Sequence, residues 1–104
     1  MIKIKLKKKD NNIIRIVITG HALYDDFGKD IVCAAVSSTV ITTINACLSI
    51  DKDYLEYNDR EGLNIEIKKN DETLVKIINS MISNLNQLEK AYPNNIQIKE
   101  ENNE

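Results

Sequence analysis

The fold is decided near the start of the chain, by the stretch IKIKLKKKDNNIIRIVI (residues 2–18). Apolar and basic residues alternate along its first half, and after Asp10-Asn11-Asn12 the alternation resumes with Arg15 between isoleucines. A period of two is typical of a strand with one buried face, and a short polar break between two such runs indicates a hairpin. We therefore expect two antiparallel strands whose buried face consists of Ile2, Ile4, Leu6, Ile14, Ile16 and Ile18.

The next stretch, 20–30, contains two glycines and three aspartates without sustained periodicity, which predicts a loop. From Ile31 the apolar residues recur at helical spacing, and Asp30 stands where an N-cap residue belongs. Many of these residues are β-branched and weak helix formers, so we expect packing against a sheet to stabilise the helix. The apolar positions are Val32, Cys33, Val36, Val40, Ile41, Ile44, Cys47 and Leu48.

The second half of the chain repeats this order of elements. Residues 54–58 and 63–69 alternate again and are joined through Asp59-Arg60-Glu61-Gly62, which favours a second hairpin. Asp71 can cap a second helix, whose single apolar stripe runs from Leu74 to Leu88 and which Pro93 ends.

Residues 95–100 alternate once more and predict a last strand at an edge of the sheet. The order β-β-α-β-β-α-β predicts an α+β fold, a two-layer sandwich with two helices packed on one face of a mainly antiparallel sheet. A length of 104 residues suits one domain, residues 1–104. We expect the acidic tail, residues 100–104, to fray.

Composition and charge limit the partners. The formal net charge of −2 gives no global attraction to nucleic acid, so direct nucleic-acid binding is not expected. The start of the chain lacks the apolar core of a signal peptide, and polar residues interrupt the apolar stretch 30–50, which disfavours a membrane span. Cys33 and Cys47 would lie about 21 Å apart on one helix and cannot form a disulfide with each other. We expect a protein of the reducing cytoplasm.

One thiol and one imidazole form the candidate catalytic pair. Cys33 falls in the first turn of the first helix, where unpaired amides and the helix dipole favour the thiolate. His21, the only histidine, precedes it by a loop long enough to fold back toward the sulfur. A cysteine with an adjacent histidine is a minimal activated nucleophile, and the same amides could receive an oxyanion.

A purely structural interpretation competes with this one. A cysteine among aliphatic residues is more often a small buried side chain than a nucleophile, and Cys47 has that interpretation almost entirely. No metal is expected, because Cys33, Cys47 and His21 are too few and are not grouped at ligand spacing.

Two motifs alter this balance. Gly20-His21-Ala22, followed after a short loop by Gly28-Lys29-Asp30-Ile31-Val32-Cys33-Ala34-Ala35-Val36-Ser37, closely resembles the signature of the bacterial ribosomal-processing cysteine protease family, Prp. The resemblance implies a small cytoplasmic cysteine endopeptidase, a homodimer without a cofactor. Its substrate would be large-subunit ribosomal protein number twenty-seven, from which such enzymes remove a short N-terminal extension.

The resemblance also assigns roles to residues of the motifs. It implies that Cys33 is the nucleophile and His21 the general base and acid. Asp30 and Ser37 match motif positions and are candidates for a supporting role. The candidate substrate-binding residues of the intervening loop are Gly20, Ala22, Tyr24, Phe27 and Gly28.

Two alternatives remain open. The rival function is a non-catalytic ribosome-associated protein-binding module of the same fold. The lysines of the first strand, Lys3, Lys5 and Lys7, are favoured as a solvated face that serves solubility and edge protection. The other interpretation of this basic patch is that it helps the protein approach a substrate associated with ribosomal RNA.

Overall fold

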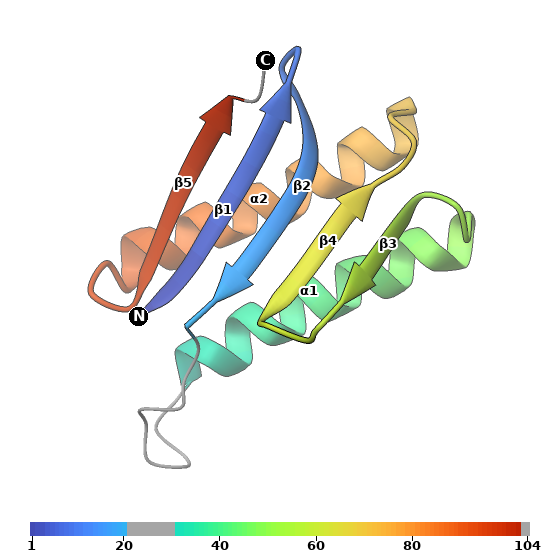
Figure 1. The fold of residues 1–104 in the computed structure, drawn as a ribbon. Helices are drawn as coiled ribbons and strands as arrows, with labels where there is room; N and C mark the ends of the chain where they lie inside the picture. Colours follow the sequence, from blue (N-terminus) through green and yellow to red (C-terminus); the bar gives the residue numbers. More distant parts are fainter. Residues whose placement is uncertain (21–30, 103–104) are drawn as a thin grey trace.

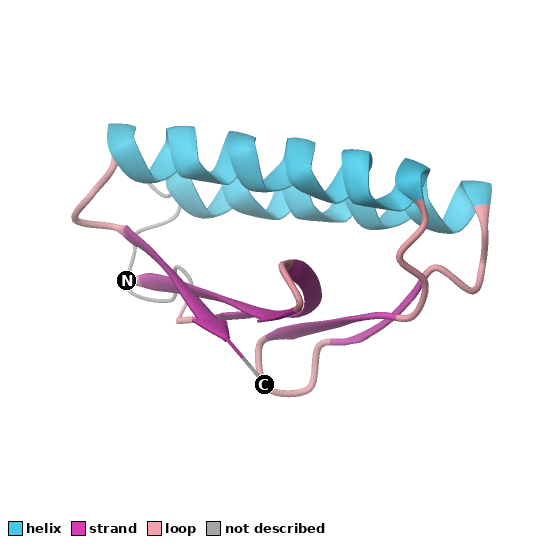
Figure 2. Cartoon of the chain, turned by 90° about the horizontal axis from the view of Figure 1, so that it is seen from above, coloured by secondary structure: helices cyan, strands magenta, loops and turns pink. Residues whose placement is uncertain are grey.

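The computed structural model describes residues 1–20 and 31–102. These residues form, in the predicted order, β1 (Ile2–Lys9), β2 (Asn12–Thr19), α1 (Ile31–Ile50), β3 (Leu55–Asn58), β4 (Leu63–Ile67), α2 (Glu72–Ala91) and β5 (Ile96–Asn102). The strands make one five-stranded sheet in the order β3-β4-β2-β1-β5 (Figure 1). Both helices lie on the same face of this sheet, side by side (Figure 2). The predicted α+β two-layer architecture is confirmed.

The first hairpin forms as predicted but contains an irregularity. Asp10 and Asn11 adopt φ angles of 53° and 65°, the left-handed conformation that both central residues of a type I′ turn require. The pairing register shifts between Lys7 and Lys8, which leaves Ile14 without a partner in the ladder. As a result Ile13, and not the predicted Ile14, packs against the core.

The sheet is mixed, because β5 pairs with β1 in parallel while the other pairs are antiparallel. β5 is an edge strand, as predicted, and β1 lies inside the sheet between β2 and β5. The expected fraying of residues 100–104 is wrong for the described part of the tail. Glu100, Glu101 and Asn102 pair with the end of β1, and Lys8 Nζ lies 3.1 Å from a carboxylate oxygen of Glu100. This pairing and ion pair order the segment.

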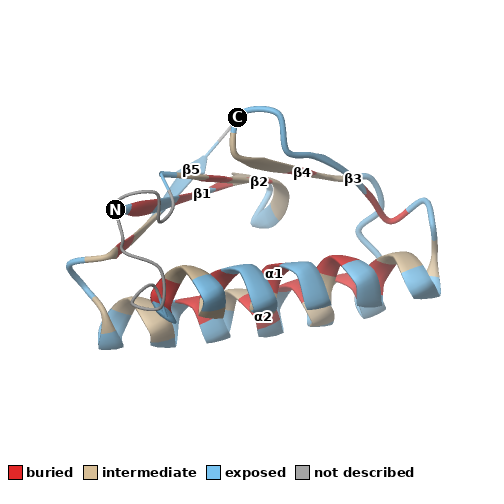
Figure 3. Ribbon diagram, turned by 90° about the horizontal axis from the view of Figure 1, so that it is seen from below, coloured by how far each residue is buried: buried red, intermediate tan, exposed pale blue. Residues whose placement is uncertain are grey.

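α1 is a core helix. By length and composition it could cross a membrane, but one of its faces packs on the sheet and on α2 (Figure 3). The buried residues of α1 are Val32, Val36, Val40, Ile44 and Cys47. They join the inward residues of β1 and β2 in an almost entirely aliphatic core. This burial stabilises a helix whose β-branched residues favour it little on their own.

α2 begins and ends where the sequence predicts. The side chain of Asp71 accepts a hydrogen bond of 2.8 Å from the Leu74 amide, which satisfies one orphan amide of the first turn. At the other end Tyr92 closes the helix before Pro93. The amide of Ile98 donates to the Glu89 carboxylate over 2.8 Å, so that α2 is also fastened to β5.

An ion pair joins the turn after α1 to the end of β4. The Asp51 carboxylate accepts hydrogen bonds from Lys69 Nζ at 2.9 Å and from the Asp53 amide at 2.8 Å. The hydrogen bond from Lys69 holds the pKa of Asp51 below its ordinary value, and that from the Asp53 amide acts in the same direction. The pairing to Asp51 raises the pKa of Lys69.

We predict that Asp51→Asn weakens the acid dependence of stability. A carboxylate whose folded pKa is depressed stabilises the fold above its unfolded value of 3.8, and this contribution is lost as pH falls through the folded pKa. Urea unfolding at about pH 6 and about pH 2.5 should therefore show a smaller difference for Asp51→Asn than for the wild type. Asp53→Asn, which removes an exposed carboxylate from the same turn, is the control; equal acid dependence in all three proteins would contradict the prediction.

Candidate functional site

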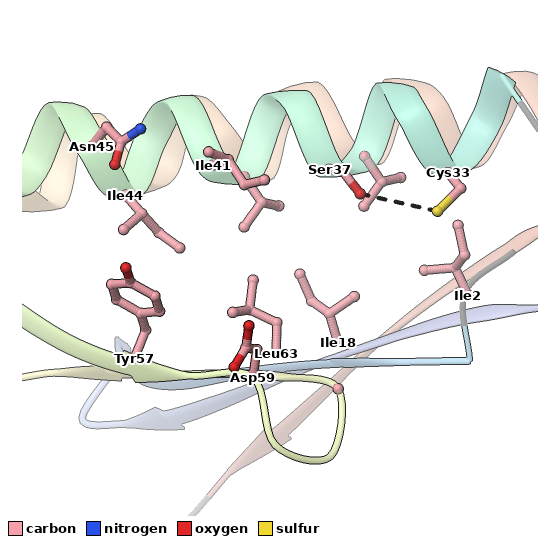
Figure 4. A pocket seen from close by; sticks show the side chains of 13 residues that line it. Ile2, Ile18, Cys33, Ser37, Ile41, Ile44, Asn45, Tyr57, Asp59 and Leu63 are labelled. Atoms are coloured by element: carbon pink, nitrogen blue, oxygen red, sulfur yellow. Dashed lines mark hydrogen bonds between the residues drawn. The ribbon is translucent and has the colours of Figure 1, made fainter. Parts of the chain in front are cut away.

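The candidate nucleophile lies at the start of α1. Cys33 is in the first turn, half-buried, and its side chain points toward the sheet, above Ile2 (Figure 4). The first amides of a helix have no partner within the helix, and the dipole is positive at this end. The described first turn of α1 contains no carboxylate that would offset this positive field. The start of α1 therefore favours a negatively charged oxygen bound beside the sulfur.

Cys33 opens into a groove of about 510 Å³ between α1 and the sheet. The groove is mainly apolar. Its α1 wall includes Val36, Val40, Ile41 and Ile44. Its floor includes Ile18 and Leu63 (Figure 4).

The groove is long enough for a short extended peptide. It follows α1 from Cys33 to Ile44 and Asn45, and a helical segment from residue 33 to residue 44 is about 16 Å long. An extended chain advances about 3.3 Å per residue, so this length accommodates about five residues. With Cys33 at one end (Figure 4), these five residues would extend from the sulfur in one direction.

A few polar groups interrupt the apolar lining. Ser37 lies one helical turn beyond Cys33, and its Oγ is 4.0 Å from the sulfur. Asn45 and Tyr57 stand at the far end, and the carboxylate of Asp59 lies on the floor beside Leu63 (Figure 4). The groove therefore combines a broad apolar surface with a few fixed polar groups, which is typical of a ligand site.

The structure brings together two of the predicted site residues, Cys33 and Ser37, on one face of α1. Gly20, also predicted, lies at the end of β2 with a φ of 71°, and a Cβ atom there would collide with the Met1 carbonyl oxygen. Glycine is therefore required at this position by the backbone itself. The remaining predicted site residues lie outside the described part of the chain and stay predictions; they are His21, Ala22, Tyr24, Phe27, Gly28 and Asp30.

The far half of the groove is not predicted by the sequence. Helical spacing places Ile41 in the apolar stripe of the helix, yet its side chain is 54% exposed and faces the groove. Tyr57, Asp59 and Leu63 come from the second hairpin, and nothing in their spacing indicates that this hairpin lies opposite α1. The position of Ile41 gives a partial indication of its exposure. It follows directly on Val40, and two consecutive residues cannot both lie at the centre of one helix face.

Cys47 has the structural role that the sequence predicts. It is fully buried in the core cluster, and this burial raises the pKa of its thiol. The two cysteines of the chain therefore differ sharply: one lines a groove at a helix start, and the other is closed off near the end of the same helix.

Comparisons with known proteins show the family of the chain. Residues 1–97 match the family model of the cysteine protease Prp. The chain is 26% identical over 103 residues to the ribosomal processing cysteine protease Prp of Bacillus subtilis, covering 88% of this chain and 89% of that protein. It is 35% identical over 89 residues to the Prp protein of Mycoplasma genitalium, covering 83% and 87%.

Solved structures give the same result. The Prp protease of S. aureus, crystallised with a covalently linked product peptide, superposes with a TM-score of 0.87 at 25% identity, covering 97% of this chain and 100% of that chain. Fold and groove thus define a small α+β cysteine protease. The chain belongs to the cysteine protease Prp family. Membership of this family favours the peptidase over the rival of a non-catalytic binding module.

We predict that iodoacetamide distinguishes the two thiols in the native protein. Cys33 should be modified at neutral pH, because its sulfur lines the groove, whereas Cys47 should react on the order of a hundredfold more slowly, because it must wait for an opening of the core. Peptide mass spectrometry after timed labelling measures both rates. Urea provides the control, since unfolding should make the rates similar; native rates within a fewfold of each other would contradict the structure.

Proposed function

We propose that this protease cleaves a peptide bond by attack of the Cys33 sulfur, with His21 as its proton carrier. The observation that supports the proposal best is the half-buried thiol at the start of α1, opening into a long apolar groove. His21 follows Gly20 in the sequence, two residues after the end of β2. It precedes Ile31, the first residue of α1, by ten positions.

The proposed reaction follows the chemistry of cysteine nucleophiles. His21 takes the thiol proton, and the sulfur forms a bond to the scissile carbonyl carbon. The first amides of α1 donate hydrogen bonds to the resulting oxyanion. When the C–N bond breaks, the imidazolium returns a proton to the departing amine. Water, deprotonated by His21, then attacks the thioester carbonyl and releases the carboxylic acid and the free enzyme.

The groove along α1 is proposed to hold the substrate on one side of the scissile bond. Its length suits about five extended residues, and its lining favours apolar side chains. The S. aureus relative was crystallised with a covalently linked product peptide, which supports a peptide as the ligand of this groove. Tyr24 and Phe27, from the loop before α1, are proposed to add to the same binding region.

The proposed substrate is the N-terminal extension of large-subunit ribosomal protein number twenty-seven, cleaved in the cytoplasm. The names of the curated relatives support processing of a ribosomal component. Asp30 and Ser37 are proposed to support the site, Asp30 as the cap of α1 and Ser37 through its position beside the sulfur.

A homodimer is the proposed assembly. The 20 residues of α1 contain no charged side chain, and Ile31 at its start is 57% exposed. Two copies of the chain could pack their α1 helices against each other without repulsion between like charges. Sedimentation equilibrium at micromolar concentration measures the assembly directly, and a monomer would exclude it.

We predict that Cys33→Ala abolishes cleavage of the extended ribosomal protein, with a loss of about a thousandfold or more, because no other described side chain of the groove is a comparable nucleophile. His21→Ala should cause a comparable loss. Mass measurement of the products detects activity and cut site together. Cys47→Ala makes the same change in the core of the same helix, and it should retain cleavage at a temperature where it remains folded. Undiminished cleavage by Cys33→Ala would contradict the proposal.

We predict that Ile41→Ser weakens substrate binding with little effect on kcat. Loss of an Ile contact that is buried by the substrate costs about 1–2 kcal/mol, so KM should rise about five- to thirtyfold. Ile50→Ser is a matched control, since Ile50 is exposed to the same extent (55% against 54%) on the same helix but lies outside the groove. Equal KM values for the two variants would show that the peptide does not contact the α1 wall.

A further inference from the structure

The face of the sheet that the helices leave open has a concentration of lysines. Both helices cover one face of the sheet (Figures 2 and 3). The residues of β1 that alternate with its core residues therefore point to the other side. On β1 these are Lys3, Lys5 and Lys7, and on the neighbouring β5 the corresponding residue is Lys99. We call these four lysines the basic face.

The register of the strands places like charges next to one another. Lys5 is the direct cross-strand partner of Lys99, and Lys7 is the partner of Arg15 on β2. Like charges directly opposite each other destabilise a sheet. The remaining partners of Lys3 and Lys5 are uncharged: Thr19, Gln97 and Val17.

Carboxylates offset the positive charge only at the edge of the basic face. Glu101 is the partner of Lys7 on β5, and Glu66 lies 3.3 Å from Arg15. Within residues 1–20 and 31–102, no ion pair involves a lysine of the basic face, whereas Lys68 and Lys69 at the other end of the sheet are both paired. The sequence therefore places cations where the described residues supply few counter-charges.

Edge protection does not explain this arrangement. Lysines on an edge strand prevent pairing with another chain, but β1 lies inside the sheet, between β2 and β5. Solubility does not require cations in register on adjacent strands either, because dispersed charges of both signs serve it equally well.

We propose that the basic face binds the phosphate backbone of RNA. Its lysines recur about 6.7 Å apart along β1 and about 4.8 Å apart across the strands, an array that can meet several phosphates of one strand. The described residues of this face include no aromatic side chain on which a base could stack, so binding does not depend on base sequence. The choice of RNA over other polyanions rests on the proposed ribosomal substrate. The proposal departs from the expectation, based on net charge, that nucleic acid is not bound.

The test measures binding of the full-length protein to an oligouridylate of about 20 nucleotides by fluorescence anisotropy over a range of salt concentrations. An oligonucleotide of about this length is long enough to span the basic face. Four phosphate contacts predict a slope of log K against log salt of about −2.8, so that raising salt from about 50 to about 200 mM weakens binding about fiftyfold. Lys3→Gln/Lys5→Gln/Lys99→Gln should reduce the slope to about −0.7.

The matched control removes the same charge elsewhere. Lys52, Lys76 and Lys90 are exposed outside the basic face, and their triple glutamine variant should retain the wild-type slope. An equal reduction of the slope in both variants would overturn the proposal, and so would a wild-type slope near zero. Binding of anionic phosphatidylglycerol vesicles through these lysines, without binding of oligouridylate, would also overturn it. Circular dichroism checks that the basic-face variant is folded. If it is not, the salt dependence of wild-type binding decides whether the proposal stands. The lysines of the basic face lie outside the groove, so the basic-face variant should still cleave a short peptide. This assay therefore tests the protease proposal independently of RNA binding.

Discussion

The structure depends on the burial of one aliphatic face of β1 and β2 beneath two helices. Ile4, Leu6 and Ile16 are almost completely inaccessible, and the core contains no buried charged group among the described residues. Exposed ion pairs contribute little each, so hydrophobic packing determines where α1 lies on the sheet. Since Cys33 is held by α1, the position of the sulfur follows from this packing.

The groove arises because the packing is incomplete on one side. α1 uses Val36, Val40 and Ile44 to contact the core, but Ile41 next to them lines the groove and remains half exposed. A domain that only needed stability would close this gap with larger side chains on β3 and β4. Apolar surface left open beside a thiol at a helix start is more consistent with a site that a ligand fills.

Much of the architecture could be predicted because it is encoded locally. The alternation within residues 2–6 and 16–18, the Asp10-Asn11 turn and the Asp71 cap each involve neighbours in sequence, and all three were predicted at the right place. Features that depend on distant partners were not. The bulge at Ile14, the extension of β5 to Asn102 and the groove opposite Ile41 all result from pairing between remote segments. Cys33 could be singled out because its helix start and motif are local, whereas Tyr57 and Asp59 could not.

The same alternation that forms the core also separates the two surfaces of the molecule. Every second residue of β1 is buried beneath the helices, on the side where the groove and Cys33 lie, and the intervening lysines point to the opposite side. A ligand on the basic face would therefore not compete with a peptide in the groove. Because β1 contributes to both surfaces, a shift of its register by one residue would exchange core and lysines and destroy both at once. The short type I′ turn and the pairing with β2 and β5 fix this register.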